Sequence, residues 1–297
     1  MKKIDITKKK IIFLILPLLL VVAGVVAYFV NGGFNFDIEF MGGVRMQVDM
    51  EKKASNEEVS SFLEEKLGIS PVIVQSGEGN SVVIKTQPIT EEQEASIYPM
   101  LKEKYQLTGE TEMSKNKVDP TFGANVQGKA VFYTLIAILL ILAYIAFRFE
   151  WRSAIMAVLS LALNILVMMA VYAITFTPLN TTFIAAMLTV IGYSINNTIV
   201  VFDRIRENMK GYRAGKNAKP VAEIVNASIW ASMGRTINTT ITTLITIVLL
   251  YVLGVPAIKE FAFPLIVGVI AGVYSSIFIA SPFWASWKQA SYDKKQK

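Results

Sequence analysis

Polar side chains recur at helical spacing inside an otherwise apolar segment, residues 182–202. Thr189, Tyr193 and either Asn196 or Asn197 share one face of a helix, because residues three and four apart lie above one another. Polar groups are costly in hydrocarbon, and in membrane proteins they mark ion and substrate pathways. The pattern therefore makes Tyr193, Asn196 and Asn197 candidates for an ion pathway.

A second polar stripe lies in the next apolar segment, and its first member is charged. The stripe comprises Arg235, Thr239, Thr242, Thr243 and Thr246. An arginine here would order water and anions or pair with a carboxylate, so Arg235, Thr239 and Thr243 are further coupling candidates. Two alternatives stay open. Thr, Ser and Asn are also ordinary contacts between membrane helices, and Arg235 also fits a flanking residue whose charge extends to the membrane surface.

The acidic residues are absent from these segments. Outside residues 31–127, every Asp and Glu stands at a segment end or in a connecting loop, and the chain has no His or Cys. A proton relay needs a titratable group, so the chain alone is a poor candidate for a proton-driven pump. Thiol and imidazole sites are excluded, and no nucleotide-binding, zinc-protease or serine-hydrolase motif is present. We expect no enzyme activity, no metal and no cofactor.

The elements that position the two stripes are membrane spans. The chain has 297 residues, of which 53% are hydrophobic, a high share for a soluble domain. A span needs about 20 predominantly apolar residues. We predict an α-helical, polytopic membrane protein with six transmembrane helices, at 11–30, 130–147, 153–174, 182–202, 237–253 (with a helix that begins near 233) and 261–280.

The basic residues predict the orientation of these spans. Lys and Arg cluster before the first segment, after the fourth and after the sixth, whereas the loops 175–181 and 254–260 are almost uncharged. By the positive-inside rule both termini face the cytoplasm. The first apolar run is too long for a cleavable signal, so we expect a retained span. The net charge of +6 follows from this topology, and we expect no nucleic-acid partner.

Residues 31–127 read as a small soluble domain outside the cytoplasm. They carry 16 acidic and 9 basic residues, a balance of −7. Helical patterns at 55–67 and 90–105 open with capping residues, Ser55 (with Glu58) and Thr90. Strand patterns occur at 44–50, 71–75, 81–86 and 110–117. The order β-α-β-β-α-β predicts a ferredoxin-like α+β fold between the first two membrane helices.

The chain therefore divides into four parts. Residues 1–30 hold a cytoplasmic N-terminus and the first span, and residues 31–127 hold the soluble domain. Residues 128–285 hold spans two to six, with a cytoplasmic loop at 203–233, and residues 286–297 form a basic cytoplasmic tail.

Residues 192–208 read GYSINNTIVVFDRIREN and resemble the signature of the SecF family of bacterial protein-export membrane proteins, usually GYS-[IL]-ND-[ST]-IVV-x-DRIREN. Residues 37–43 (DIEFMGG) and 144–151 (YIAFRFEW) are similar to two further family motifs, as is Arg235-Thr236 at the start of the fifth span. The resemblance is weakest in 44–127. It places a set of signature residues at the cytoplasmic interface: Asp203, Arg204, Arg206, Glu207 and Asn208.

The resemblance implies half of a resistance-nodulation-division transporter, located in the bacterial inner membrane and paired with a SecD subunit of the same plan. Such a pair would assist the SecYEG channel and the SecA ATPase, and would use a proton or sodium gradient to draw unfolded preproteins across. The family's charged positions correspond to Asn197 and Arg235. Asn197 departs from the family pattern, because an amide cannot titrate. Either a SecD carboxylate carries the ion, or coupling is modified or lost.

Three functions follow from these observations. The leading one is an auxiliary translocase subunit, in contact with SecD, the channel, preprotein and membrane lipid. The second is a structural scaffold without ion flow, which Asn197 favours. The third is a small-molecule efflux half-transporter, which is less favoured because such pumps usually have twelve spans and two large external loops in one chain.

Overall fold

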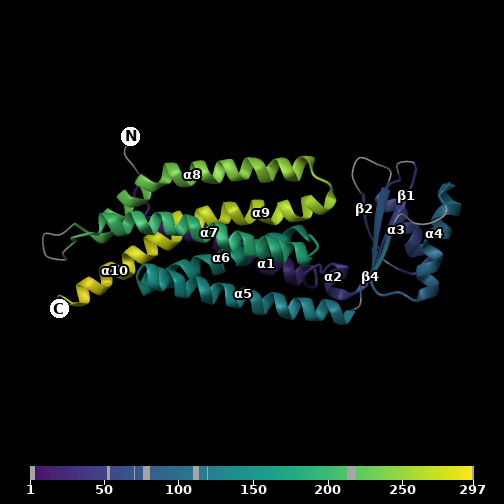
Figure 1. Cartoon of the computed structure of the whole chain (residues 1–297), viewed down its shortest axis with the longest axis horizontal. Coiled ribbons are helices and arrows are strands. Elements are labelled where there is room, and N and C mark those ends of the chain that lie inside the picture. Colours follow the sequence, from purple (N-terminus) through teal and green to yellow (C-terminus); the bar gives the residue numbers. More distant parts are fainter. Residues whose placement is uncertain are drawn as a thin grey trace.

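The computed structural model describes residues 4–51, 54–69, 71–75, 81–109, 114–118, 120–212 and 219–295. An elongated bundle of helices carries a small sheet domain at one end, and α10 lies at the opposite end (Figure 1). Parts of the predicted strand 110–117 and of the predicted loop 203–233 lie outside the described residues.

The bundle consists of long apolar helices. They are α1 Lys10–Val30, α5 Pro120–Arg148, α6 Trp151–Thr175, α7 Thr181–Asn208, α8 Val221–Leu253 and α9 Pro256–Ser275, which continues through a π-helical turn, Ser276–Ala280, into α10 Ser281–Lys295. With α9 to α10 taken as one, five helices among the described residues are long and apolar enough to cross a membrane. The chain is therefore a multi-pass membrane protein.

The predicted second span is the exception. It lies in α5, and the apolar stretch of that helix among the described residues is Phe132–Arg148. Five of the six predicted spans therefore correspond to helices that are long and apolar enough to cross a membrane, and the predicted second span corresponds to an apolar stretch within the 29-residue helix α5.

Helix α7 is the centre of the bundle and packs against α6, α8 and α9. Helix α7 lies close to α9 because Gly268 of α9 faces it. A Cβ added at Gly268 would lie 2.4 Å from Val190 Cγ2, so a larger residue would push the two helices apart. Helix α8 packs on α7, α9 and α10, whereas α5 packs on α6 at the other side of the bundle (Figure 1). One long face of α8 therefore lies outside the bundle.

The sheet domain has the predicted order of elements. They are β1 Gly43–Asp49, α3 Asn56–Leu67, β2 Val72–Gln75, β3 Ser81–Thr86, α4 Glu91–Tyr105 and β4 Ser114–Val118. The strands pair antiparallel in the order β2-β3-β1-β4. Buried side chains of the sheet, α3 and α4 form one apolar core, which includes Val48, Val59, Leu63, Ile97 and Leu101.

Of the two predicted helix caps, one forms. Thr90 makes a complete capping box with Gln93, whose backbone N–H donates to Thr90 Oγ1 at 3.2 Å. Ser55 is at the N-cap position of α3, as predicted, but its side chain makes no capping hydrogen bond. Its expected partner, Glu58, instead pairs with Lys104 of α4 at 3.6 Å. A contact between two helices has replaced the local one.

Candidate functional site

The polar residues predicted in α7 lie on two different faces of the helix. Asn197 is 2% exposed, and its amide nitrogen has no hydrogen-bond partner among the described residues. Tyr193 is half-buried, and its hydroxyl donates to Thr240 Oγ1 of α8 at 3.3 Å. Asn196 is exposed. The structure therefore brings Tyr193 and Asn197 to the interior of the bundle and leaves Asn196 on its surface.

The stripe of α8 lies mostly on the face that is outside the bundle. Arg235, Thr239, Thr242 and Thr246 are exposed, and Thr243 is half-buried. Each of these threonine hydroxyls donates to a carbonyl three or four residues earlier in the same helix. The guanidinium of Arg235 has no ion pair within the described part of the chain. The hydroxyls are thus satisfied locally, and the arginine is not.

Two buried polar atoms without a hydrogen-bond partner in the described part of the chain, Asn197 Nδ2 and Thr236 Oγ1, lie at the same level of the α7–α8 contact. The pairs Tyr193–Thr240 and Asn208–Ser228 set the antiparallel register of the two helices, and this register places Asn197 level with Thr236. Thr236 is also 2% exposed, and its hydroxyl oxygen has no hydrogen-bond partner among the residues described. Buried polar atoms are almost always paired in proteins, so this level of the contact is suited to a bridging water or to a change in helix packing.

The structure contains a buried polar cluster that sequence reasoning missed. Asn164 of α6 lies 2.7 Å from Ser194 Oγ of α7, and with its amide turned over it also reaches Ser275 Oγ of α9 at 2.7 Å. Thr198 Oγ1 lies 2.7 Å from Ser276 Oγ, at the start of the π-helical turn. The small residues Ser194 and Thr198, four apart in the signature segment, were the signal that would have indicated this cluster. It holds three helices together by hydrogen bonds.

The signature residues at the end of α7 form ion pairs. Asp203 Oδ1 lies 3.0 Å from Arg206 Nη2 and 3.8 Å from Arg148 Nη2 of α5. Arg204 pairs with Glu207 at 2.9 Å, one turn further along the helix. These side chains are more than 40% exposed, so each pair contributes little to stability. Their position at the tip of the bundle fits an interface with water.

A buried group of charges joins the sheet domain to the bundle. Lys85 of β3 lies 2.6 Å from Asp37 Oδ2 and 3.5 Å from Glu260 Oε1 of α9. Asn180, the N-cap of α7, donates to Glu260 Oε2 at 2.7 Å. Lys85 and Asp37 are both under 10% exposed. We call the set Asp37, Lys85, Asn180 and Glu260 the charged joint.

Backbone contacts strengthen the charged joint. The N–H of Asp37 donates to the carbonyl of Leu179 at 2.8 Å, and the N–H of Leu179 donates to that of Asn35 at 2.7 Å. Glu39, in the short helix α2 (Ile38–Met41), accepts from the backbone N–H of Thr181 at 2.8 Å. A carboxylate is stabilised at a helix N-terminus. The start of α7 is therefore fixed to the segment that leads into β1.

None of these groups has the composition of a metal site. Among the described residues, no three His, Cys, Asp or Glu side chains lie close enough together to hold a metal ion. The polar groups of α7 and α8 instead supply hydrogen-bond donors and acceptors for water, and Arg235 supplies one fixed positive charge. The arrangement is suited to hydrogen bonding and to pairing with an acid from outside the chain.

A statistical model of the family described as "Protein export membrane protein SecD/SecF, C-terminal" matches residues 100–290. The chain is 34% identical over 295 residues to "Protein translocase subunit SecF" of Alicyclobacillus acidocaldarius, and the match covers 98% of this chain and 95% of that protein. It is 36% identical to "Protein translocase subunit SecDF" of Bacillus subtilis over 97% of this chain, but spans only 38% of that longer protein.

A solved structure is similar in fold as well as in sequence. The crystal structure of SecDF from Thermus thermophilus, titled a translocon-associated membrane protein, superimposes with a TM-score of 0.83 at 32% identity. The match covers 96% of this chain and 39% of that one. This chain therefore spans only part of the length of that longer relative.

The charged joint predicts a large effect of removing its lysine. Replacing Lys85 by Met leaves Asp37 buried without its partner, so we expect the full-length protein to lose about 3–5 kcal/mol of stability. Thermal unfolding in detergent, followed by circular dichroism, measures the loss. Lys117→Met is the matched control, because Lys117 is 57% exposed and pairs only at 3.8 Å. If both variants melt at the same temperature, the joint does not stabilise the fold.

Proposed function

The chain belongs to the SecD/SecF family of protein-export membrane proteins, and we propose that it is an auxiliary subunit of the Sec translocase that acts with SecD in the late, ion-gradient-assisted movement and release of preproteins. Its similarity to named translocase subunits supports this role. Relatives that join SecD and SecF in one chain imply an association with SecD. The SecYEG channel, the SecA ATPase and the preprotein are the further partners that the role requires.

The observation that carries the proposal is the outward polar face of α7 and α8. Arg235, Asn196 and Thr239 are exposed on helices long enough to cross a membrane. A charged side chain within a span faces the interior of a bundle or a water-filled cavity, because contact with lipid tails is costly. This chain provides no cover for that face in its described residues. The helices of a SecD subunit would cover it.

The proposed ion step uses Arg235 as a fixed positive charge. Asn197 is an amide and cannot carry a proton, so the titrating carboxylate would come from SecD. A positive charge within about 4–6 Å lowers the pKa of such a carboxyl group. Asn197 and Thr236, buried and level with each other, would hold water beside it. The scaffold function, without ion flow, remains the second candidate because Asn197 stands where the family carries an acid.

The membrane arrangement is also part of the proposal. We place the sheet domain outside the cytoplasm and both termini inside, since Lys and Arg gather at the α10 end of the bundle. Helix α5, the predicted second span, would complete the set of six, because the helix extends from Pro120 beyond its apolar stretch Phe132–Arg148. The antiparallel order β2-β3-β1-β4 supports the ferredoxin-like assignment of the domain. Its acidic surface would contact emerging preprotein weakly.

We predict that Arg235→Leu impairs export more than Asn197→Ala does, because only Arg235 supplies a charge to the partner's acid. The measurement is processing of a pulse-labelled preprotein in cells that co-express the matching SecD. Arg235→Lys keeps the charge and should retain most of the activity. If Asn197→Ala were the more damaging change, the amide would itself bind the ion; if neither mattered, the chain would be a scaffold.

We predict opposite labelling of cysteines at the two ends of the bundle. The native chain has no Cys, so single substitutions at Glu65, Lys259 and Lys219 report cleanly, and all three side chains are exposed. A membrane-impermeant maleimide should label positions 65 and 259 in intact cells, and position 219 only after the membrane is opened. Labelling of position 219 in intact cells would reverse the proposed orientation.

A further inference from the structure

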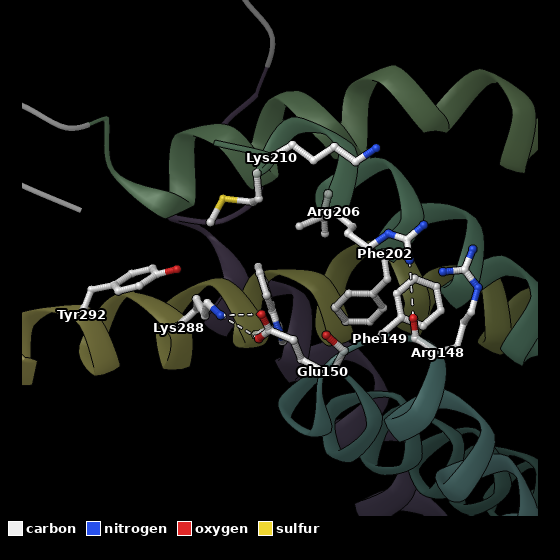
Figure 2. A pocket seen from close by; sticks show the side chains of 12 residues that line it. Arg148, Phe149, Glu150, Phe202, Arg206, Lys210, Lys288 and Tyr292 are labelled. Atoms are coloured by element: carbon white, nitrogen blue, oxygen red, sulfur yellow. Dashed lines mark hydrogen bonds and ion pairs between the residues drawn. The ribbon is translucent and has the colours of Figure 1, made fainter. Parts of the chain in front are cut away.

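A pocket of about 440 Å³ lies at the end of the bundle opposite the sheet domain, a size typical of small-ligand sites. The end of α5, the turn after it, the end of α7 and helix α10 form its walls. In Figure 2, the Lys288–Glu150 pair lies on one side of the pocket and the guanidinium groups of Arg148 and Arg206 lie on the other. Segments distant in sequence thus bring four cationic side chains, including Lys210, to one hollow.

The charges that line this pocket are not balanced. The ammonium of Lys288 is neutralised by Glu150, whose two carboxylate oxygens lie 2.7 and 2.6 Å away. Arg148 and Arg206 share the single carboxylate of Asp203, and Lys210 has no ion pair among the described residues. The pocket therefore keeps an excess of positive charge with free N–H donors. Guanidinium and ammonium groups of this kind bind phosphate through short, charge-assisted hydrogen bonds.

Aromatic side chains place the pocket at the level where a membrane meets water. Phe149 lies under the guanidinium groups of Arg148 and Arg206, at 5.3 and 5.4 Å from its ring centre. Trp151 and Trp287 make an edge contact at 5.1 Å between ring centres. Tryptophan and tyrosine gather at the headgroup level of membrane proteins, where their rings are partly apolar and partly hydrated.

An exposed apolar surface runs along α5, the helix whose last residue, Arg148, lines the pocket. Phe147, which precedes Arg148 of the pocket wall, is 93% exposed. Tyr144, Leu140 and Leu139 are more than half exposed above it on the same helix. An apolar surface of this kind accommodates acyl chains, whereas a free anion would make no use of it. The site thus offers a charged end for a headgroup and an apolar track for its tails.

We propose that the pocket binds the phosphate headgroup of an anionic phospholipid, with the acyl chains along the exposed side of α5. Basic pockets between membrane helices bind anionic headgroups through this combination of charge and position. The phosphate contacts Arg148, Arg206 and Lys210, and so relieves the competition of two arginines for Asp203. Bound lipid holds the ends of α5, α7 and α10 in one arrangement, which is the region that carries the family signature.

The test is native mass spectrometry of the full-length protein in detergent, titrated with phosphatidylglycerol or with phosphatidylcholine of the same acyl chains. We expect clearly tighter binding of phosphatidylglycerol. Lys210→Gln, which removes no ion pair found in the structure, should weaken this binding about fivefold, the effect of one basic residue near an anionic surface. Lys219→Gln removes an exposed lysine outside the pocket and should leave binding unchanged.

Three results would overturn the proposal. Equal binding of the two lipids would mean that the headgroup charge is not recognised. Equal weakening by Lys210→Gln and Lys219→Gln would mean that the basic surface as a whole, and not the pocket, attracts lipid. Full displacement of phosphatidylglycerol by an excess of inorganic phosphate would identify a site for free anions. A thermal melt of each variant checks that the fold is unchanged, and Arg206→Gln provides a second substitution within the pocket.

Discussion

Polar groups inside a membrane are costly when they are unpaired, and two sets of polar residues in the bundle meet this constraint in different ways. The first set is satisfied within the chain: Asn164, Ser194, Thr198 and Ser276 bond to one another between α6, α7 and α9. The second set lies on the exposed face of α8, where the threonine hydroxyls donate to backbone carbonyls of the same helix. Arg235 cannot satisfy itself in this way, and we propose that a partner's carboxylate pairs with it. The proposed role beside SecD depends on this one side chain more than on any other.

Helix α7 links the features that matter for function. Its first residues are fixed to the sheet domain through Glu39 and the charged joint, and its last turn forms one wall of the basic pocket. Between these ends it carries Tyr193 and Asn197 against α8. A single helix of 28 residues therefore connects the sheet domain, the Asn197 level of the α7–α8 contact and the opposite end of the bundle.

Local patterns in the sequence were enough for much of this architecture. Apolar runs indicated the long helices, and the alternation of strand and helix patterns indicated the order of elements in the sheet domain. Helical spacing placed the polar residues of α8 on one face, but it could not decide between Asn196 and Asn197, because which face of α7 is buried depends on its neighbours. The charged joint was beyond prediction, since Asp37, Lys85 and Glu260 meet only after folding. Ser55 stands at the N-cap of α3 without a side-chain capping bond, and the carboxylate of Glu58 pairs with Lys104 of α4.

The central claim is that the outward polar face of α8 is covered by SecD. A photo-crosslinking amino acid at Thr242, exposed on that face, tests it in cells that co-express the matching SecD. Leu139, exposed on α5 at the other side of the bundle, is the control position (Figure 1). The account predicts a strong adduct with SecD from position 242 and only background from position 139. Adducts of equal yield from both positions, or an adduct from position 139 alone, would contradict it.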